Sequence, residues 1–252
     1  MIQSRVNSMR ALAVVCLLLF VTAPAVRAQK IARVGLVTRV EIREAERLLA
    51  DLGYWTGPVD GVFDPATKFA LTAFQKWEHR TVTGRLSADE IAAIRSAAKP
   101  LPRDGDYEHV EVDVDRQVLL LLDGKGSVRV LPVSTGTDKP FVYDSQTSIA
   151  YTPRGRFLVY EKGVGWEDNS LGMYYANFIS GGIAIHGSYS VPAEPASHGC
   201  IRIPLFAARE LSKRMSVGTI VLIYDKVSFV SAKSWVENPK LKEAALANIA
   251  LY

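Results

Sequence analysis

Cysteine is scarce in this sequence of 252 residues, and neither sign of charge is in large excess. The only two cysteines are Cys16 and Cys200. Residues 1–28 hold three Arg and no acidic residue, which leaves 27 basic and 26 acidic residues in the rest of the chain. This balance disfavours a nucleic-acid-binding protein, because neutralising phosphates requires clustered positive charge. A hydrophobic content of 48% is typical of a globular protein and argues against a disordered chain.

Long apolar runs are also rare, and the clearest one lies near the N-terminus. Residues 11–26 carry no charge and follow Arg5 and Arg10, while Val26-Arg27-Ala28 offers small residues for cleavage. This pattern is typical of a secretory signal peptide over residues 1–28. The stretch is short for a membrane span, which needs about 20 apolar residues; an uncleaved anchor is the alternative. Cleavage removes Cys16, so that Cys200 is left without a partner for an intramolecular disulfide.

Residues 40–95 show helical periodicity. Ile42, Ala45, Leu48, Leu49 and Leu52 form one apolar stripe that ends at Gly53. A second stripe runs from Ala66 to Trp77 after the cap Asp64-Pro65, and Ser87-Ala88-Asp89-Glu90 opens a third helix. The sequence therefore predicts a three-helix bundle, in which a glycine-rich loop over residues 53–61 joins the first two helices.

From residue 107 the periodicity changes to that of strands. Residues 96–106 contain two prolines and are interpreted as a linker. Val110, Val112 and Val114 alternate with polar residues, which predicts a half-buried strand. Further strands are predicted at 118–122, 128–130, 147–151, 156–161, 182–186 and 219–224, and one helix near 204–215. Residues 107–225 are thus expected to be mainly β. Residues 226–252 form a tail, with a short helix that presents Leu241, Ala245, Ile249 and Tyr252 on one side.

Two of the four histidines lie near Cys200 in the sequence. His186 ends an apolar run, and His198 belongs to Ser197-His198-Gly199-Cys200-Ile201-Arg202, whereas His79 and His109 are interpreted as surface residues. A thiol with a pKa near 8.5 is mostly protonated at neutral pH, so a nucleophilic cysteine needs a base. His198 can approach Cys200 locally in an extended segment, and His186 only through the fold.

The residues around Cys200 suit acyl transfer. Gly199 leaves space beside the sulfur atom, and backbone N–H groups at Gly199 and Cys200 can stabilise an oxyanion. If the chain is extended, Arg202 lies on the same side as Cys200 and suits a substrate carboxylate. The alternative is a plain surface charge.

The helical segment resembles the peptidoglycan-binding type 1 family. The matching residues are Leu48-Leu49, Leu52-Gly53-Tyr54, Gly57-Pro58-Val59-Asp60-Gly61-Val62-Phe63, Thr67, Ala73-Phe74-Gln75 and Thr83-Gly84. The resemblance implies contacts with the bacterial cell wall, for which Tyr54, Trp55 and Asp60 are the candidates. Alternatively, the two aromatic side chains complete the core of the bundle.

The second segment resembles the catalytic domain of L,D-transpeptidases of the YkuD type. Its matching motifs are His186-Gly187, Ser197-His198-Gly199-Cys200-Ile201-Arg202, Leu131-Pro132-Val133-Ser134-Thr135-Gly136 and Thr152-Pro153-Arg154-Gly155-Arg156-Phe157. The fold class implied is a small all-α three-helix peptidoglycan-binding bundle (40–95), followed after the linker by a mainly β L,D-transpeptidase catalytic domain (107–225).

This resemblance implies that Cys200 is the nucleophile and His186 its base. His198 and Gly199 would shape the catalytic site, and Arg202, Ser197 and Gly187 would contact or orient the substrate and the imidazole. The implied reaction releases D-Ala from a tetrapeptide stem through a thioester and transfers the acyl group to an amine. No cofactor or metal is expected. The expected partners are peptidoglycan stem peptides and glycan in the periplasm or cell wall, with no nucleic acid and no membrane span after signal cleavage.

Three alternatives remain open at this point. His186, His198 and Cys200 can serve as the ligands of a catalytic zinc ion. The β domain can be an inert part of a wall-binding protein. Within the enzymatic interpretation, hydrolysis by an L,D-carboxypeptidase or attachment of another protein uses the same acyl-enzyme.

Overall fold

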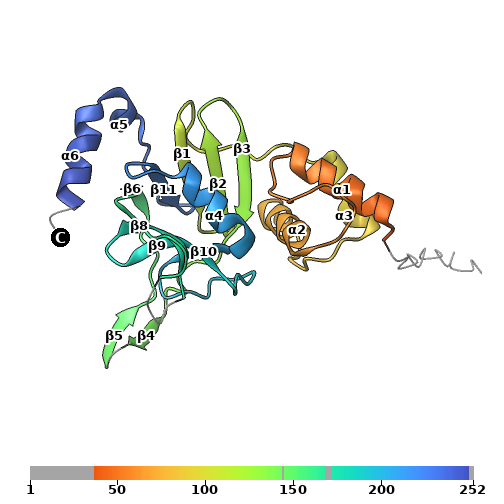
Figure 1. Ribbon diagram of the computed structural model, residues 1–252, viewed down its shortest axis with the longest axis horizontal. Helices are drawn as coiled ribbons and strands as arrows, with labels where there is room; N and C mark the ends of the chain where they lie inside the picture. The colour runs from red at the N-terminus through yellow and green to blue at the C-terminus, as the bar shows by residue number, and fades with distance from the viewer. Residues whose placement is uncertain (1–36, 144, 168–171, 250–252) are drawn as a thin grey trace, which may run out of the picture. The chain divides into compact units, whose positions relative to one another are not determined.

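A computed structural model describes residues 37–143, 145–167 and 172–249 (Figure 1). The predicted signal peptide over residues 1–28 and the predicted helix position Tyr252 lie outside these described residues. No helix in the described ranges has the length and apolar character that crossing a membrane requires.

The three predicted N-terminal helices are confirmed. They are α1 (Arg39–Asp51), α2 (Pro65–Trp77) and α3 (Ala88–Ser96). Each begins at a side-chain cap that accepts a hydrogen bond from a backbone N–H: Thr38, Asp64 and Ser87. These caps are local sequence signals, which explains why the helix starts can be predicted from the sequence alone.

The mainly β region that follows is also confirmed, and its larger sheet has five strands in the order β3-β2-β1-β11-β6. All pairs in this sheet are antiparallel except β1 and β11, which run parallel with Val110 beside Val221. The strands are β1 (Glu108–Asp113), β2 (Val118–Asp123), β3 (Val128–Pro132), β6 (Gly155–Leu158) and β11 (Ile220–Tyr224).

A second sheet has four strands in the order β10-β9-β8-β7. Its strands are β7 (Glu161–Lys162), β8 (Tyr174–Ser180), β9 (Ile183–Ser188) and β10 (Ile201–Pro204). A separate hairpin pairs β4 (Pro140–Tyr143) with β5 (Gln146–Ile149), and helix α4 spans Leu205–Arg214. The sequence did not predict β4, β8 or β10: β4 and β8 lack regular alternation of apolar and polar residues, and β10 alternates over only four residues.

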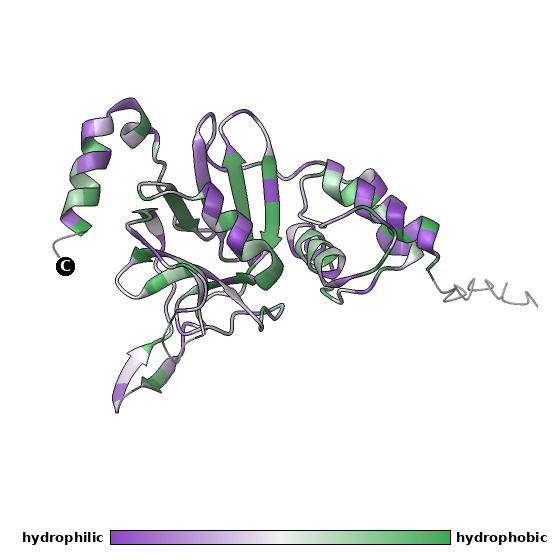
Figure 2. Cartoon of the chain, viewed as in Figure 1, coloured by the Kyte–Doolittle hydropathy of each residue, from purple (hydrophilic) through white to green (hydrophobic). Residues whose placement is uncertain are grey.

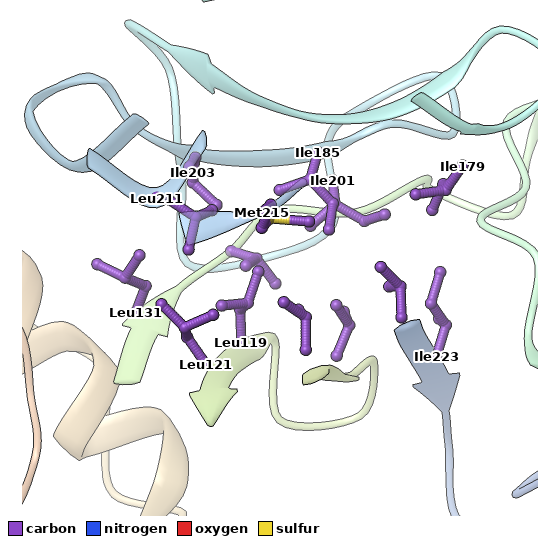
Figure 3. Close-up of a cluster of buried hydrophobic side chains, with 14 of the residues drawn as sticks. Leu119, Leu121, Leu131, Ile179, Ile185, Ile201, Ile203, Leu211, Met215 and Ile223 are labelled. Carbon is purple, nitrogen blue, oxygen red and sulfur yellow. The ribbon is translucent and has the colours of Figure 1, made fainter. Parts of the chain in front are cut away.

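The main core lies between the two sheets and α4 (Figure 3). Leu119, Leu121 and Leu131 from β2 and β3 face Ile185, Ile201 and Ile203 from β9 and β10, with Leu211 of α4 among them. One face of the smaller sheet is therefore committed to the core, which leaves its other face for a functional site.

The helices α1–α3 pack on the other face of the larger sheet. Val118, Leu120 and Leu122 of β2 share a buried cluster with Leu49 and Phe74 of these helices. Figure 2 shows β2 as hydrophobic along almost its whole length, as expected for a strand covered on both faces. The helices and sheets belong to one compact unit. The buried cluster between the helices and the larger sheet forms a second core that joins the helical segment to the β region.

The interpretation of His109 as a surface residue is wrong, because its side chain is fully buried on β1. Its Nδ1 lies 2.9 Å from the Tyr107 carbonyl oxygen and its Nε2 lies 3.1 Å from Glu111 Oε1. Glu111 also accepts hydrogen bonds from the backbone N–H groups of Arg103 and Asp104. The segment interpreted as a linker therefore folds over β1, and the strand predicted to be half-buried is buried on both faces.

The C-terminal segment covers the opposite end of the same sheet. It forms α5 (Lys233–Glu237) and α6 (Pro239–Ile249), and Ala245 and Ile249 of α6 pack against a cluster of β6 and β11 residues. Asp104 accepts hydrogen bonds from the Ser231 hydroxyl and the Ala232 N–H, which connects residues 103–104 to the start of this segment.

Candidate active site

The parallel pairing of β9 and β10 brings the two halves of the motif together. In this register Arg202 lies beside His186, and Ile201 lies beside Ile185. Alternate residues of a strand share one face, and Ile185 and Ile201 point into the main core. The side chains of His186 and Arg202 therefore lie on the opposite face, where His186 is 3% exposed and Arg202 is partly exposed. Cys200 directly precedes β10 and packs against Ala184, which precedes His186 by two residues on the same face.

His186 is held in one orientation by its own strand. Its Nδ1 lies 2.9 Å from the carbonyl oxygen of Gly187. Since a carbonyl oxygen only accepts hydrogen bonds, Nδ1 carries the proton and Nε2 carries the free electron pair. Burial lowers the pKa of His186 below its ordinary value, the bond to Gly187 opposes this shift, and the positive charge of Arg202 adds to it. The neutral, basic form is favoured at neutral pH.

Cys200 is partly buried in an apolar surrounding. Its Sγ is 3.6 Å from the Gly182 carbonyl oxygen, and its neighbours include the cluster of Met173, Ala176 and Ala184. Burial raises the pKa of the Cys200 thiol, while the Ala184 N–H and the charge of Arg202 partly offset this rise. The thiol is therefore the resting form, and it acts as a hydrogen-bond donor.

Arg202 is the charged group that acts on both His186 and Cys200. Its positive charge lowers the pKa of each of them, since a cation disfavours a second cation and favours a thiolate. Its backbone is fixed by two hydrogen bonds of 3.1 Å with Ser134.

The turn before Cys200 is held by hydroxyl groups. Ser197 Oγ accepts a hydrogen bond from the Gly199 N–H and donates one to the Cys200 carbonyl oxygen, at 3.0 and 2.6 Å. The Gly199 N–H is thus engaged inside the turn, which corrects the expectation that it faces an oxyanion. Ser197 is buried and shapes the turn, which argues against its expected contact with substrate.

Gly199 has a φ of +144° that other residues rarely adopt. An added Cβ atom would lie 2.7 Å from Ile183 Cδ1 and 2.9 Å from the Tyr151 carbonyl oxygen. This position therefore requires glycine on steric grounds, because of Ile183 and the Tyr151 carbonyl group.

Thr152 links the remaining motifs to this turn. Its buried hydroxyl donates to the Gly199 carbonyl oxygen at 2.6 Å and accepts from the Gly136 N–H at 2.8 Å. The sequence alone indicated no role for Thr152, although Thr152 begins one of the motifs that resemble those of L,D-transpeptidases. Gly136 and Ser197 also form an isolated bridge, so that three separate motifs converge on the segment that carries Cys200.

The ring of His198 lies against the β4–β5 hairpin. It is exposed and stacks on Phe141, with 4.4 Å between the ring centroids. The geometry hence favours His186 over His198 as the histidine that serves Cys200. Phe141 is a site neighbour that the sequence did not reveal, because β4 was not predicted.

Gly187 has a packing role. It is buried on β9, and an added Cβ atom would lie 2.6 Å from Ala208 Cβ of α4. The Cα atom of Gly187 faces α4, which argues against a direct contact with substrate. The carbonyl oxygen of Gly187 orients the ring of His186.

The three candidate wall-binding residues lie in different environments. Tyr54 is 1% exposed and packs edge-on against Phe74. It belongs to the core shared with β2, which argues against the expected wall contact. Trp55 is half-buried beneath Arg129. Asp60 is exposed, and its carbonyl oxygen accepts hydrogen bonds from Arg39 and Arg43.

Within residues 37–143, 145–167 and 172–249, no three His, Cys, Asp or Glu side chains gather closely enough to hold one metal ion. The zinc alternative for His186, His198 and Cys200 therefore lacks a ligand cluster in this part of the chain.

Comparisons with known proteins agree with this arrangement. Residues 107–223 match the YkuD family, described as the L,D-transpeptidase catalytic domain, and residues 38–94 match a peptidoglycan binding domain family. The crystal structure of an L,D-transpeptidase from Xylanimonas cellulosilytica is similar, at 36% identity and a TM-score of 0.69, over 73% of this chain and 93% of that chain.

Two curated proteins share shorter stretches with this chain. The OxPP cycle protein OpcA of Synechocystis is 30% identical over 89 residues, which cover 35% of this chain and 19% of that protein. The localization factor PodJL of Caulobacter vibrioides is 40% identical over 47 residues, 19% of this chain and 5% of that protein. The chain thus spans a small part of the curated relatives it matches.

Proposed function

This chain belongs to the L,D-transpeptidase family with a YkuD-type catalytic domain, and we propose that it is an L,D-transpeptidase that acts on peptidoglycan tetrapeptide stems through Cys200. The observation that supports this proposal most directly is the pairing of β9 with β10, which sets His186, Arg202 and the segment of Cys200 on the same face of the sheet.

The first step begins from a neutral thiol and a neutral imidazole, in line with the directions of their pKa shifts. As Cys200 Sγ attacks the carbonyl carbon of the third stem residue, its proton passes to Nε2 of His186. The C–N bond to D-Ala then breaks, and D-Ala takes that proton from Nε2 as it leaves. The acyl group stays on sulfur as a thioester.

The second step returns the enzyme to its starting form. An amine of a neighbouring stem attacks the thioester carbon, and His186 removes the proton of that amine. The C–S bond breaks, and the departing sulfur atom recovers its proton from His186. An amide is thus exchanged for an amide, so that the reaction needs no activated nucleotide outside the cell membrane.

Arg202 and the backbone of Cys200 supply the electrostatic part of this proposal. The charge of Arg202 favours the thiolate that develops during attack, and its guanidinium suits a carboxylate of the stem peptide. Since the Gly199 N–H is engaged with Ser197 Oγ, the Cys200 N–H is the candidate oxyanion donor of this pair.

Peptidoglycan as the substrate also suggests where the protein acts. The helical segment matches a family described as a peptidoglycan binding domain, and the β region matches the L,D-transpeptidase catalytic domain. We place the protein in the bacterial envelope, to which the predicted signal peptide over residues 1–28 would export it.

The test is mass spectrometry of products from the wild-type protein incubated with tetrapeptide donor and acceptor stems. The expected products are a cross-linked dimer and free D-Ala, with a thioester adduct on Cys200 in the intact-mass spectrum. Cys200→Ala should abolish product formation and leave the melting temperature unchanged; turnover like that of the wild type in this variant would refute the assignment. A tripeptide without dimer would indicate an L,D-carboxypeptidase, and binding without any product a non-catalytic wall-binding protein.

A further inference from the structure

Lys76 in the last turn of α2 is a buried lysine that the proposed chemistry does not use. Its side chain is 5% exposed, although lysine is almost never fully buried without partners. Burial lowers the pKa of Lys76 to about 7, and the negative charge of Glu194 opposes this shift. Burial of the Lys76 ammonium group removes its hydration, so the charged form requires hydrogen bonds from the protein in place of water.

The ammonium group of Lys76 finds those hydrogen bonds in the β region. Nζ lies 2.8 Å from the carbonyl oxygen of Val133, 3.3 Å from that of Gln117 and 3.5 Å from that of Pro192. Three N–H donors of one ammonium group thus face three carbonyl acceptors. The acceptors come from three segments: the turn before β2, the end of β3, and the loop between β9 and β10.

Val133 connects this contact to the catalytic turn. The next residue, Ser134, donates from Oγ to the Glu194 carbonyl oxygen at 2.8 Å and exchanges two backbone hydrogen bonds with Arg202. The carbonyl oxygen of Thr135 accepts from the N–H groups of Ala196 and Ser197. Within residues 192–197, Pro192 therefore accepts a hydrogen bond from Lys76, and Ala196 and Ser197 bond to Thr135. Thr135 follows Val133, which also accepts a hydrogen bond from Lys76.

Gln117 strengthens the same connection. Its backbone carbonyl oxygen accepts from Lys76, while its side-chain amide accepts from the Thr135 N–H at 2.9 Å and donates to Thr135 Oγ1 at 2.7 Å. Two of the three carbonyl groups bound by Lys76 thus belong to segments that bond directly to residues 134–135.

We propose that Lys76 is a positioning residue through which the helical segment fixes the loop that carries Ser197 and Cys200. The catalytic consequence rests on the proposed function, whereas the ordering of the loop does not. The helical segment then contributes to the activity of the β region even for a small substrate that does not touch the helices.

The experiment compares the full-length wild type with Lys76→Met, which keeps the length of the side chain and removes its donors. Lys68→Met on the exposed side of the same helix is the matched control. Hydrogen exchange of the Ala196 and Ser197 amides is measured without substrate, with Leu120 in the core as reference. Values of kcat and KM are measured with a soluble tetrapeptide stem, under conditions where urea titration shows each variant to be folded.

We expect Lys76→Met to accelerate exchange at Ala196 and Ser197 and not at Leu120. Its kcat should fall by about 10- to 100-fold with little change in KM, because misplacing a reacting group by about 1 Å has effects of this size. Lys68→Met should match the wild type. A folded Lys76→Met with wild-type exchange and kcat overturns the proposal, and faster exchange with unchanged kcat overturns the positioning role.

Two further outcomes are decided by the same measurements. If Lys76→Met does not fold, Lys76→Gln retains an uncharged donor; intermediate losses in exchange protection and kcat support the proposal, and wild-type values overturn it. If the wild type itself shows no turnover, the proposed function fails, and the exchange data still decide whether Lys76 orders the loop.

Discussion

Two segments that carry family motifs, residues 186–202 and the glycine-rich loop 53–61, have different roles in the fold. In residues 186–202 the chemically important side chains of His186 and Arg202 lie on the face of the smaller sheet that points away from the main core. In the loop 53–61, Tyr54 turns inward against Phe74 and forms a bridge with Val130 of β3. The first segment supplies chemistry, whereas the second joins the helices to the edge of the larger sheet.

The difference arises from what each segment packs against. One face of β9 packs on the main core, so strand alternation places His186 on the opposite face, toward Cys200 and Arg202. The loop 53–61 has no such alternation, and its large aromatic side chain gains more by entering the second core than by facing water. A family motif thus supplies candidate catalytic residues in residues 186–202 and an interface between the helices and the larger sheet in the loop 53–61.

The largest effect that distinguishes the two regions is expected for His186→Ala. Removing a general base reduces kcat/KM by about 10²–10⁴-fold, and the steady-state rate with a tetrapeptide donor measures it. His79→Ala is the matched control, because His79 is exposed at the end of α2. His109→Ala is unsuitable as a control, since it removes a buried partner of Glu111. Equal losses at positions 186 and 79 would contradict the assignment of the base.

The next effect is expected for Gly199→Ala. The new methyl group would collide with Ile183 and the Tyr151 carbonyl group, and the resulting shift of Cys200 should lower kcat by about 100-fold. Gly105→Ala is the matched control, because an added Cβ atom at this position meets no atom within 4 Å. Kinetics and intact-mass detection of the acyl-enzyme give the comparison; normal acylation of Gly199→Ala would show that the turn tolerates displacement.

A substitution in the other region should affect stability and leave the chemistry of the folded protein unchanged. Tyr54→Ala opens a cavity in the second core and should lower the free energy of unfolding by about 3–5 kcal/mol. Tyr54→Phe keeps the ring and removes a hydroxyl that has no hydrogen-bond partner within the described part of the chain, so it should be neutral or stabilising by about 1 kcal/mol. Urea denaturation measures both, and a wall-binding defect of Tyr54→Phe without loss of stability would contradict the core role.

The sequence could predict elements with local signals and could not predict contacts made between distant segments. Thr38, Asp64 and Ser87 cap the three helices through neighbouring residues. The sequence of β8 lacks regular alternation, and its pairing with β9 contains register shifts. For this reason a search for strand periodicity does not detect β8. His109 looks like a surface residue because its partners, Glu111 and the Tyr107 carbonyl group, satisfy it only after residues 103–104 fold over β1.

The same limit holds for the site. Cys200 and His186 are identifiable by their motif, since nucleophile and base chemistry restricts the residue types. The burial of Ser197 and the stacking of His198 on Phe141 depend on a hairpin and a turn whose positions come from long-range pairing. Lys76 is hidden for the same reason, because its three acceptors lie more than 40 residues away along the chain.

The smallest expected effect concerns pH and tests the assignment of His186, Cys200 and Arg202 to one site. Burial first and the charge of Arg202 second lower the pKa of His186, so the acid limb of kcat/KM should lie below pH 6.5, the ordinary histidine value. Above this limb His186 is neutral and accepts the thiol proton, and below it the imidazolium cannot. Arg202→Met removes a positive charge, which should raise the pKa of both His186 and Cys200 and move the acid limb to higher pH.

Arg209→Met on the exposed side of α4 is the control that leaves the limb unchanged. The pH profile of kcat/KM gives the His186 limb, and the pH dependence of alkylation by iodoacetamide gives the Cys200 thiol, whose pKa burial raises and Arg202 lowers. Both curves should move in the same direction in Arg202→Met, because one cation acts on both groups. Added salt should shift the wild type in that direction as well, since it screens the same charge. A shift confined to only one of the two curves would show that the charge of Arg202 does not act on both the base and the nucleophile.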